Sequence, residues 1–209
     1  MDAVQRQLYD QIDDATQRLL GTARVMAEPD LRQPSLLPGW TRARVLAHLA
    51  RSADAMRTML IGARTGEDRP AYASAQAREA DIERSAAQQV KDLVTDVADS
   101  AMALRTIARL LPDQAWAHSV RIPRSAPSPA GQLLTRRLVE VELHHCDLAA
   151  GYSPADWPAA FAAMVLAEPM HSQREDRLSR PQEILDSVPP LHPARVPGQP
   201  RKGVGPLFS

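Results

Sequence analysis

The chain has 209 residues, of which 44% are hydrophobic and only 4% aromatic, and its 25 Lys and Arg residues balance its 25 Asp and Glu residues. This length suits one substantial domain with an appendage, and the absence of net charge argues against binding to nucleic acid or to an anionic membrane. Few aromatic residues in a chain dominated by Ala and Leu favour a helical fold over a β-sandwich. A polar N-terminus, no apolar run near the ~20 residues that span a bilayer, and a single cysteine indicate a cytoplasmic protein.

The first third of the chain predicts two amphipathic helices. Residues 3–26 carry apolar side chains at every third or fourth position, which predicts a first helix. Prolines and a glycine interrupt this pattern, and Thr41 is a suitable N-cap for a second helix that runs to about residue 64. Val45 and Leu49 belong to the apolar stripe of this helix, so His48 is expected on or beside the buried face, where its ring needs a polar partner.

A third helix is expected after the Gly- and Pro-containing loop at residues 66–75. Apolar residues recur at helical spacing from Ile82 to Leu111, so this segment predicts one long helix that Pro112 ends. Residues 115–122 then have the composition of a short strand.

The remaining chain predicts two more helices and a tail. Ser128 and the proline after it are typical of a helix start, so residues 128–150 are expected to form a fourth helix and residues 153–168 a fifth. Eight of the 18 prolines fall in residues 169–209. We therefore expect an all-α bundle over residues 1–168 and an extended or poorly ordered tail, with a short helix at most near residues 181–185.

The fourth helix carries the segment LVEVELHHCDL, which contains the most distinctive polar residues of the chain. Glu140 and His144 are four residues apart, so their side chains lie on one side of the helix, as two ligands of one ion would. In a helical bundle His48 could supply a third ligand, leaving an open position as in a catalytic zinc site. The alternative from spacing alone is a surface pair or a hydrogen-bonded core histidine.

Neighbouring polar residues of the fourth helix have other expected roles. Glu142 and Cys146 form a second pair four residues apart that faces away from the first. Cys146 has no adjacent base, so we interpret it as a buried residue and not as a nucleophile, and His145 falls in the apolar stripe as a structural histidine. Arg136 and Arg137 could bind a carboxylate or form solvated ion pairs.

Four segments together resemble a known family. Residues 37–56 and 136–158, with residues 77–86 and 111–120, are similar to the N-terminal domain of mycothiol-dependent maleylpyruvate isomerases, a branch of the DinB-like metal-binding four-helix bundles. The resemblance extends over residues 4–166 in the same order.

This resemblance implies a zinc ion bound by His48, Glu140 and His144, and mycothiol as the thiol cofactor. It implies isomerisation of maleylpyruvate to fumarylpyruvate in gentisate breakdown. Zinc deprotonates the cofactor thiol, the thiolate adds to the cis double bond, and its expulsion after rotation leaves the trans alkene, so no protein nucleophile is needed. Arg78, Arg84 and Arg137 are candidates for binding substrate carboxylates or mycothiol.

The tail departs from the family, whose members carry a small α/β domain after the bundle that is thought to supply an arginine to the active site. Residues 169–209 show no strand alternation that could build such a domain. A mycothiol S-transferase acting on another electrophile, or a non-catalytic metal-binding bundle, therefore remain alternatives. The expected partners are the small-molecule substrate and thiol cofactor, with no nucleic acid or membrane, and the chain is expected to be a monomer or homodimer.

Overall fold

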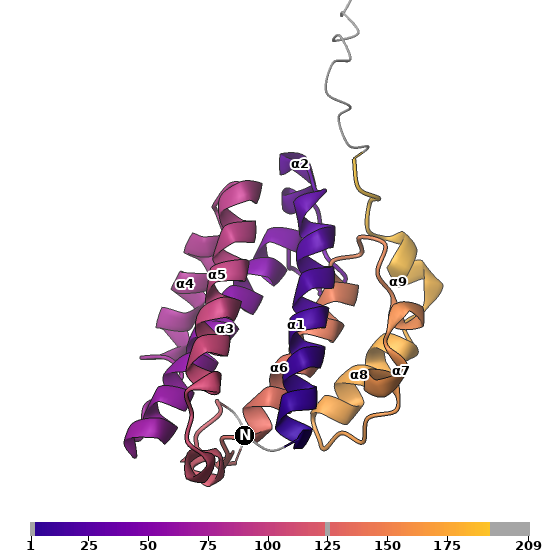
Figure 1. The fold of residues 1–209 in the computed structure, drawn as a ribbon. Helices are drawn as coiled ribbons and strands as arrows, with labels where there is room; N and C mark the ends of the chain where they lie inside the picture. The colour runs from indigo at the N-terminus through magenta and orange to yellow at the C-terminus, as the bar shows by residue number, and fades with distance from the viewer. Residues whose placement is uncertain (1–2, 124–125, 193–209) are drawn as a thin grey trace, which may run out of the picture.

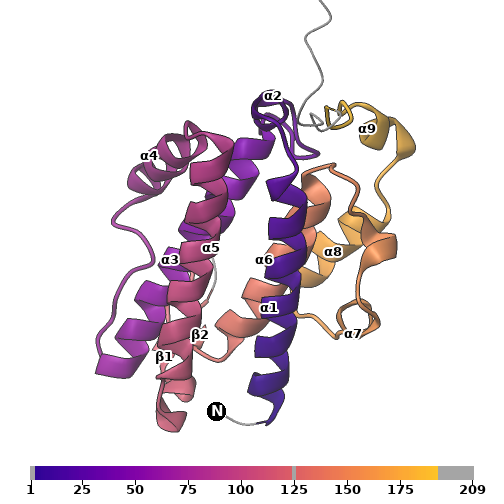
Figure 2. The same cartoon turned by 45° about the horizontal axis from the view of Figure 1, so that its top comes forward.

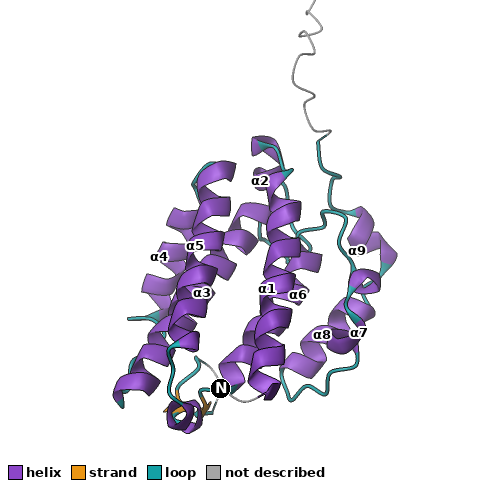
Figure 3. Cartoon of the chain, viewed as in Figure 1, coloured by secondary structure: helices purple, strands orange, loops and turns teal. Residues whose placement is uncertain are grey.

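Helices form nearly all of the regular structure of the chain (Figures 1 and 3). The computed structural model describes residues 3–123 and 126–192. Its elements, in order, are α1 (Ala3–Arg24), α2 (Glu28–Arg32), α3 (Arg42–Thr65), α4 (Ala75–Ala86), α5 (Val90–Arg109), η1 (Asp113–Ala117), β1 (Ser119–Val120), β2 (Ser128–Pro129), α6 (Gln132–Asp147), η2 (Pro154–Asp156), α7 (Ala159–Ala162), α8 (Met170–Leu178) and α9 (Gln182–Asp186).

Helices α1, α3, α5 and α6 pack side by side as a four-helix bundle, which confirms the all-α prediction (Figure 1). Helix α4 packs against α3, and α8 packs against α6 (Figure 2). The core consists of two apolar clusters, both bordered by Leu8 and Ile12 of α1. No helix in the described part of the chain is long and apolar enough to cross a membrane.

Helix α3 begins and ends where its local sequence dictates. The Thr41 hydroxyl accepts a hydrogen bond from the backbone N–H of Arg44, as expected for an N-cap, and Gly66 ends the helix in the left-handed conformation with φ 75°. The stripe deduced from the sequence is buried, with at most 4% exposure, at Val45, Leu49, Ser52, Met56, Met59 and Leu60. This helix therefore presents one continuous face to the bundle interior.

The expected long third helix is wrong, because the segment divides into α4 and α5 at residues 87–89. Side chains from the α2 region stabilise the break. The Arg32 guanidinium donates to the carbonyl of Ala86 at 2.7 Å, and Glu28 accepts from the backbone N–H of Val90 at 2.7 Å. These bonds satisfy the end of one helix and the start of the next, where backbone groups otherwise lack partners.

The fourth helix is shorter than expected. Ser128 and Pro129 form β2, which pairs antiparallel with β1. Of the strand expected at residues 115–122, only residues 119 and 120 belong to β1. Helix α6 then begins at Gln132 and ends at Asp147, before Ala149 takes a positive φ of 48°.

The expected fifth helix over residues 153–168 is also wrong. Only η2 and the four-residue α7 form there. Trp157 is extended, with ψ 134°, because it precedes Pro158, and a residue before proline is disfavoured in the helical region.

The tail is partly helical in its described portion, residues 169–192, contrary to the expected disorder there. Helix α9 matches the short helix expected at residues 181–185, but α8 is an additional element. Arg174 anchors α8 by donating to the carbonyls of Phe161 and Met164 at 3.2 and 2.8 Å. Residues 193–209 lie outside the described part, and the proposed domain boundary at residue 168 stays a prediction.

Candidate functional site

The structure brings His48, Glu140 and His144 to one cavity. His48 comes from α3 and the other two residues from α6, and the His48 and His144 rings meet edge to face with centroids 4.9 Å apart. All three line a cavity of about 140 Å³. Helix α8 covers the same cavity, whose other lining residues include Arg136, Met170, Gln173 and Arg177.

Asp147 orients the ring of His144. The Nδ1 atom of His144 lies 2.9 Å from Oδ2 of Asp147, a buried carboxylate that also accepts from Arg177 and Arg180 at 2.8 and 3.0 Å. Burial opposes ionisation of Asp147, but the hydrogen bonds from His144 and Arg177 outweigh it and lower its pKa to about 2. An ionised carboxylate only accepts, so Nδ1 of His144 carries the proton and Nε2 keeps a lone pair for a ligand.

Arg78 engages the other histidine. Its Nη2 lies 3.1 Å from Nδ1 of His48, and because a guanidinium only donates, Nδ1 must be the acceptor. Burial, reinforced by the positive charge of Arg78, holds the pKa of His48 well below its usual value. The neutral ring therefore carries its proton on Nε2, and Arg78 occupies its lone pair.

Glu140 is engaged as well, since its carboxylate accepts a short hydrogen bond from Ser52 of α3. Within residues 3–123 and 126–192, no group of three or more His, Cys, Asp or Glu side chains is arranged to hold a metal ion. The donor types of His48, Glu140 and His144 still suit a divalent cation such as zinc, which prefers imidazole nitrogen and carboxylate oxygen. Arg78 must release His48 before the three residues can act as ligands together, whereas Glu140 can keep the hydrogen bond from Ser52 on one of its oxygens.

A larger cavity adjoins the site and shares His48 and Glu140 with it. Its volume is about 900 Å³, and its walls come from α3, α4, α6 and the loops at residues 68–74 and 121–123. Arg78, Arg121 and Arg136 line it, and the Arg78 guanidinium lies 5.6 Å from the ring centre of Tyr72. A ligand with carboxylates would meet these guanidinium groups beside His48, in competition with Asp68, which pairs with Arg121 at 3.0 Å, and with Glu79, which lies 3.6 Å from Arg78.

The three arginines expected from the sequence occupy different places. Arg78 is at the site, as described. Arg84 is exposed on α4 and pairs with Asp81 at 2.7 Å, outside both cavities. Arg137 is buried and donates to the carbonyl of Leu49 at 2.8 Å, but it lines neither cavity.

Sequence reasoning missed the contributions of Ser52, Arg177 and Arg180. Ser52 is on the same helical stripe as His48, which was the available signal. Nothing in the local sequence of α8 marks Arg177 or Arg180, because their roles arise from tertiary packing against Asp147.

His145 and Cys146 are buried, as predicted, and Glu142 is buried as well. His145 stacks on Tyr152 with ring centres 3.7 Å apart and lies 2.7 Å from the Thr22 hydroxyl, and burial lowers its pKa to about 4. Burial also raises the pKa of Cys146 to about 12, so this thiol stays protonated at neutral pH. Glu142 accepts from Arg18 at 2.6 Å.

Comparison with known proteins supports the fold of the bundle. The profile of the mycothiol maleylpyruvate isomerase N-terminal domain matches residues 12–149. Two crystal structures of a mycothiol-dependent maleylpyruvate isomerase, one of them a histidine-to-alanine mutant, superpose with a TM-score of 0.72 and 27% sequence identity. Each alignment covers 75% of this chain and 65% of the solved chain, so the chain spans less than two thirds of those enzymes. No curated protein matches the sequence. The chain therefore belongs to the mycothiol maleylpyruvate isomerase N-terminal domain family.

Proposed function

We propose that the protein is a zinc-dependent enzyme that uses mycothiol as its thiol cofactor and isomerises maleylpyruvate to fumarylpyruvate. The observation that carries this proposal is the meeting of His48 with His144, from two helices far apart in sequence, in a cavity that Glu140 also lines. Family membership supports mycothiol and the isomerase reaction.

The metal ligands in this proposal are His48, Glu140 and His144. Bound zinc would act as a Lewis acid and lower the pKa of a coordinated thiol. His144 offers Nε2 because Asp147 holds its other nitrogen. His48 offers a nitrogen only after Arg78 withdraws, since Arg78 requires the lone pair of Nδ1 and thereby keeps the proton on Nε2.

The surrounding arginines bind the substrate in this proposal. Maleylpyruvate is a diacid, and the guanidinium groups of Arg78, Arg136 and Arg177 line the two adjoining cavities beside the histidines. A guanidinium pairs well with a carboxylate through two parallel hydrogen bonds. Mycothiol would supply the thiol whose reversible addition allows the double bond to rotate, and we place it in the cavity of about 900 Å³ beside His48.

Turnover of maleylpyruvate tests the proposal. The purified chain, loaded with zinc, is mixed with mycothiol and maleylpyruvate, and the ultraviolet spectrum is followed as fumarylpyruvate forms. We expect mycothiol-dependent turnover that a His48→Ala variant lacks. Absence of turnover with a full complement of zinc would reject the isomerase reaction.

One observation favours a second candidate function, a mycothiol S-transferase. The described part of the tail forms α8, which packs against α6, and α9, whereas the solved isomerases extend well beyond the length aligned here. If α8 closes the site in place of a further domain, the site could accept an electrophile other than maleylpyruvate. Mass spectrometry after incubation with mycothiol and model electrophiles would then find a stable thioether, and recovery of only unmodified thiol would count against this activity.

A further inference from the structure

The cavity of about 900 Å³ extends well beyond the two histidines. Along α3 its lining runs from His48 through Ser52 to Met59. Met59 comes eleven residues after His48, so the cavity follows this helix for about 16 Å at a rise of about 1.5 Å per residue. A ligand that fills the cavity therefore reaches far from the proposed metal site.

The end of this cavity remote from His48 has apolar walls. Met56, Met59 and Ile122 line it and belong to one apolar cluster of the core, against which Ala71 packs. Methionine side chains adapt their shape to irregular apolar surfaces, so the two methionines suit a variable ligand. More exposed proline side chains complete the wall. We call these residues the apolar end of the cavity: Met56, Met59, Pro70, Ala71, Ile122 and Pro123.

The charged groups beside the apolar end neutralise each other. Asp68 and Arg121 lie on the two loops that line the cavity, and their side chains pair at 3.0 Å. Burying a charged ligand group against an apolar wall is costly unless an opposite charge pairs with it. The apolar end therefore favours an uncharged group.

Neither ligand of the proposed reaction has a group that suits the apolar end. Maleylpyruvate is a diacid, and mycothiol carries hydroxyl-rich sugar and inositol units. Such groups lose hydration without gaining hydrogen bonds when they are buried against methionine and proline. A hydrocarbon group, in contrast, gains about fourfold in affinity for each methylene that it buries.

We propose that the apolar end binds an uncharged hydrocarbon arm of the molecule that reacts at the metal site. The arm is an alkyl chain or a ring, and it lies between the methionines of α3 and the loop residues 70–71 and 122–123. The substrates then include electrophiles with one polar, reactive end and one apolar end, in addition to diacids. This substrate class rests on the proposed thiol chemistry, whereas binding of the arm does not.

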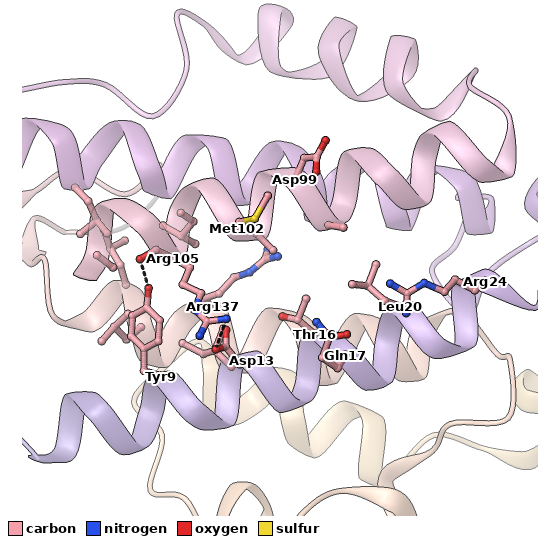
Figure 4. A pocket seen from close by; sticks show the side chains of 18 residues that line it. Tyr9, Asp13, Thr16, Gln17, Leu20, Arg24, Asp99, Met102, Arg105 and Arg137 are labelled. Atoms are coloured by element: carbon pink, nitrogen blue, oxygen red, sulfur yellow. Dashed lines mark hydrogen bonds and ion pairs between the residues drawn. The ribbon is translucent and has the colours of Figure 1, made fainter. Parts of the chain in front are cut away.

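A second apolar cavity is the competing place for a hydrocarbon. It lies between α1 and α5, has a volume of about 230 Å³ and shares no lining residue with the cavity around His48 (Figure 4). Met102 lines this second cavity. Its methyl group therefore reports on a ligand between α1 and α5, as the methyl groups of Met56 and Met59 report on a ligand at the apolar end.

NMR of the unaltered chain with ¹³C-labelled methionine methyl groups tests where a hydrocarbon binds. The probe is 2-octanone, an uncharged ketone, beside 2-butanone, which has a shorter chain. We expect 2-octanone to shift the signals of Met56 and Met59 but not that of Met102, and to bind at least tenfold more tightly than 2-butanone, because it buries more methylenes. Equal affinities, or a shift confined to Met102, would overturn the proposal.

Variants of one loop test the location independently. Ala71→Phe places a ring in the apolar end, so it should weaken binding of 2-octanone at least tenfold. Ala73→Phe is the matched control, because Ala73 is in the same loop but lines a neighbouring cavity and not this one, and it should retain binding. Undiminished binding by Ala71→Phe would contradict the proposal.

These measurements use neither zinc nor mycothiol, so they separate this proposal from the isomerase reaction. Binding of 2-octanone at Met56 and Met59 by a chain that does not isomerise maleylpyruvate would support the apolar subsite and reject the reaction. Isomerisation of maleylpyruvate by a chain that does not bind 2-octanone would reject the apolar subsite alone.

Discussion

At the scale of single residues, two charged side chains set opposite conditions for the two histidines. Asp147 accepts from Nδ1 of His144 and leaves Nε2 available, whereas Arg78 donates to Nδ1 of His48 and occupies its lone pair. His144 can therefore bind a metal cation through Nε2. At His48, the guanidinium of Arg78 competes with a metal cation for the ring. The metal affinity of the site should depend on both of these partners.

Replacing Arg78 should strengthen zinc binding. Arg78→Met removes both a competitor for His48 and a positive charge beside the incoming cation, so we expect zinc affinity to rise about tenfold in a calorimetric titration. Arg84→Met is the matched control, because Arg84 is on the same helix but exposed and paired with Asp81. A weaker affinity in Arg78→Met would mean that Arg78 supports the site and does not block it.

Acid should destabilise the protein through Asp147. Its folded pKa, about 2, is below its ordinary value of 3.8, so its stabilising effect is complete above about pH 4 and is lost as the pH falls toward 2. We expect about 2 kcal/mol of unfolding free energy to depend on this group. Urea denaturation at pH 6 and pH 3 should therefore show a smaller pH effect in Asp147→Asn than in the unaltered chain, and equal pH effects would contradict this role.

At the scale of elements, the sequence predicted those features that local residues determine. The buried stripe of α3 and its Thr41 cap follow from helical periodicity and capping chemistry. The division between α4 and α5 could not be predicted, because Arg32 and Glu28 stabilise it from a distant part of the chain. The helix expected over residues 153–168 does not form, because Pro158 disfavours a helical conformation at Trp157.

Removing the bonds from α2 should loosen the junction of α4 and α5. Arg32→Met deletes hydrogen bonds to the carbonyls of Ala86, Ala87 and Gln88, and we expect a loss of about 1 kcal/mol in unfolding free energy. Hydrogen exchange should quicken at amides around residues 87–93. Exchange rates unchanged in that segment would show that the break is intrinsic to its own sequence.

At the scale of the whole molecule, helix α8 closes the site. The meeting of His48, Glu140 and His144 at one cavity could be predicted, because Glu140 and His144 are one turn apart and His48 is expected on or beside the buried face of its helix. The closing residues on α8 could not, because a polar, proline-rich segment gives no periodic signal, and Arg177 and Arg180 acquire their role only on reaching the buried Asp147.

Variants of Arg177 and Arg180 should distinguish an effect on substrate binding from an effect on folding. Both pair with Asp147, but only Arg177 lines the cavity beside the histidines. We expect Arg177→Met and Arg180→Met to lower unfolding free energy similarly, and only Arg177→Met to reduce kcat/KM for maleylpyruvate, by about tenfold. Equal losses of kcat/KM in both variants would indicate that Arg177 acts through folding alone.

The most direct test of the account is the metal content of the purified chain together with the identity of its ligands. Elemental analysis and X-ray absorption should find one bound zinc with nitrogen and oxygen neighbours, and His48→Ala and His144→Ala should each lose it while remaining folded by circular dichroism. The matched control His145→Ala removes a histidine that contacts Thr22 and Tyr152, and it should keep the zinc. Zinc retained in full by His48→Ala, or no zinc bound by the unaltered chain, would contradict the proposal that residues of α3 and α6 share one metal ion.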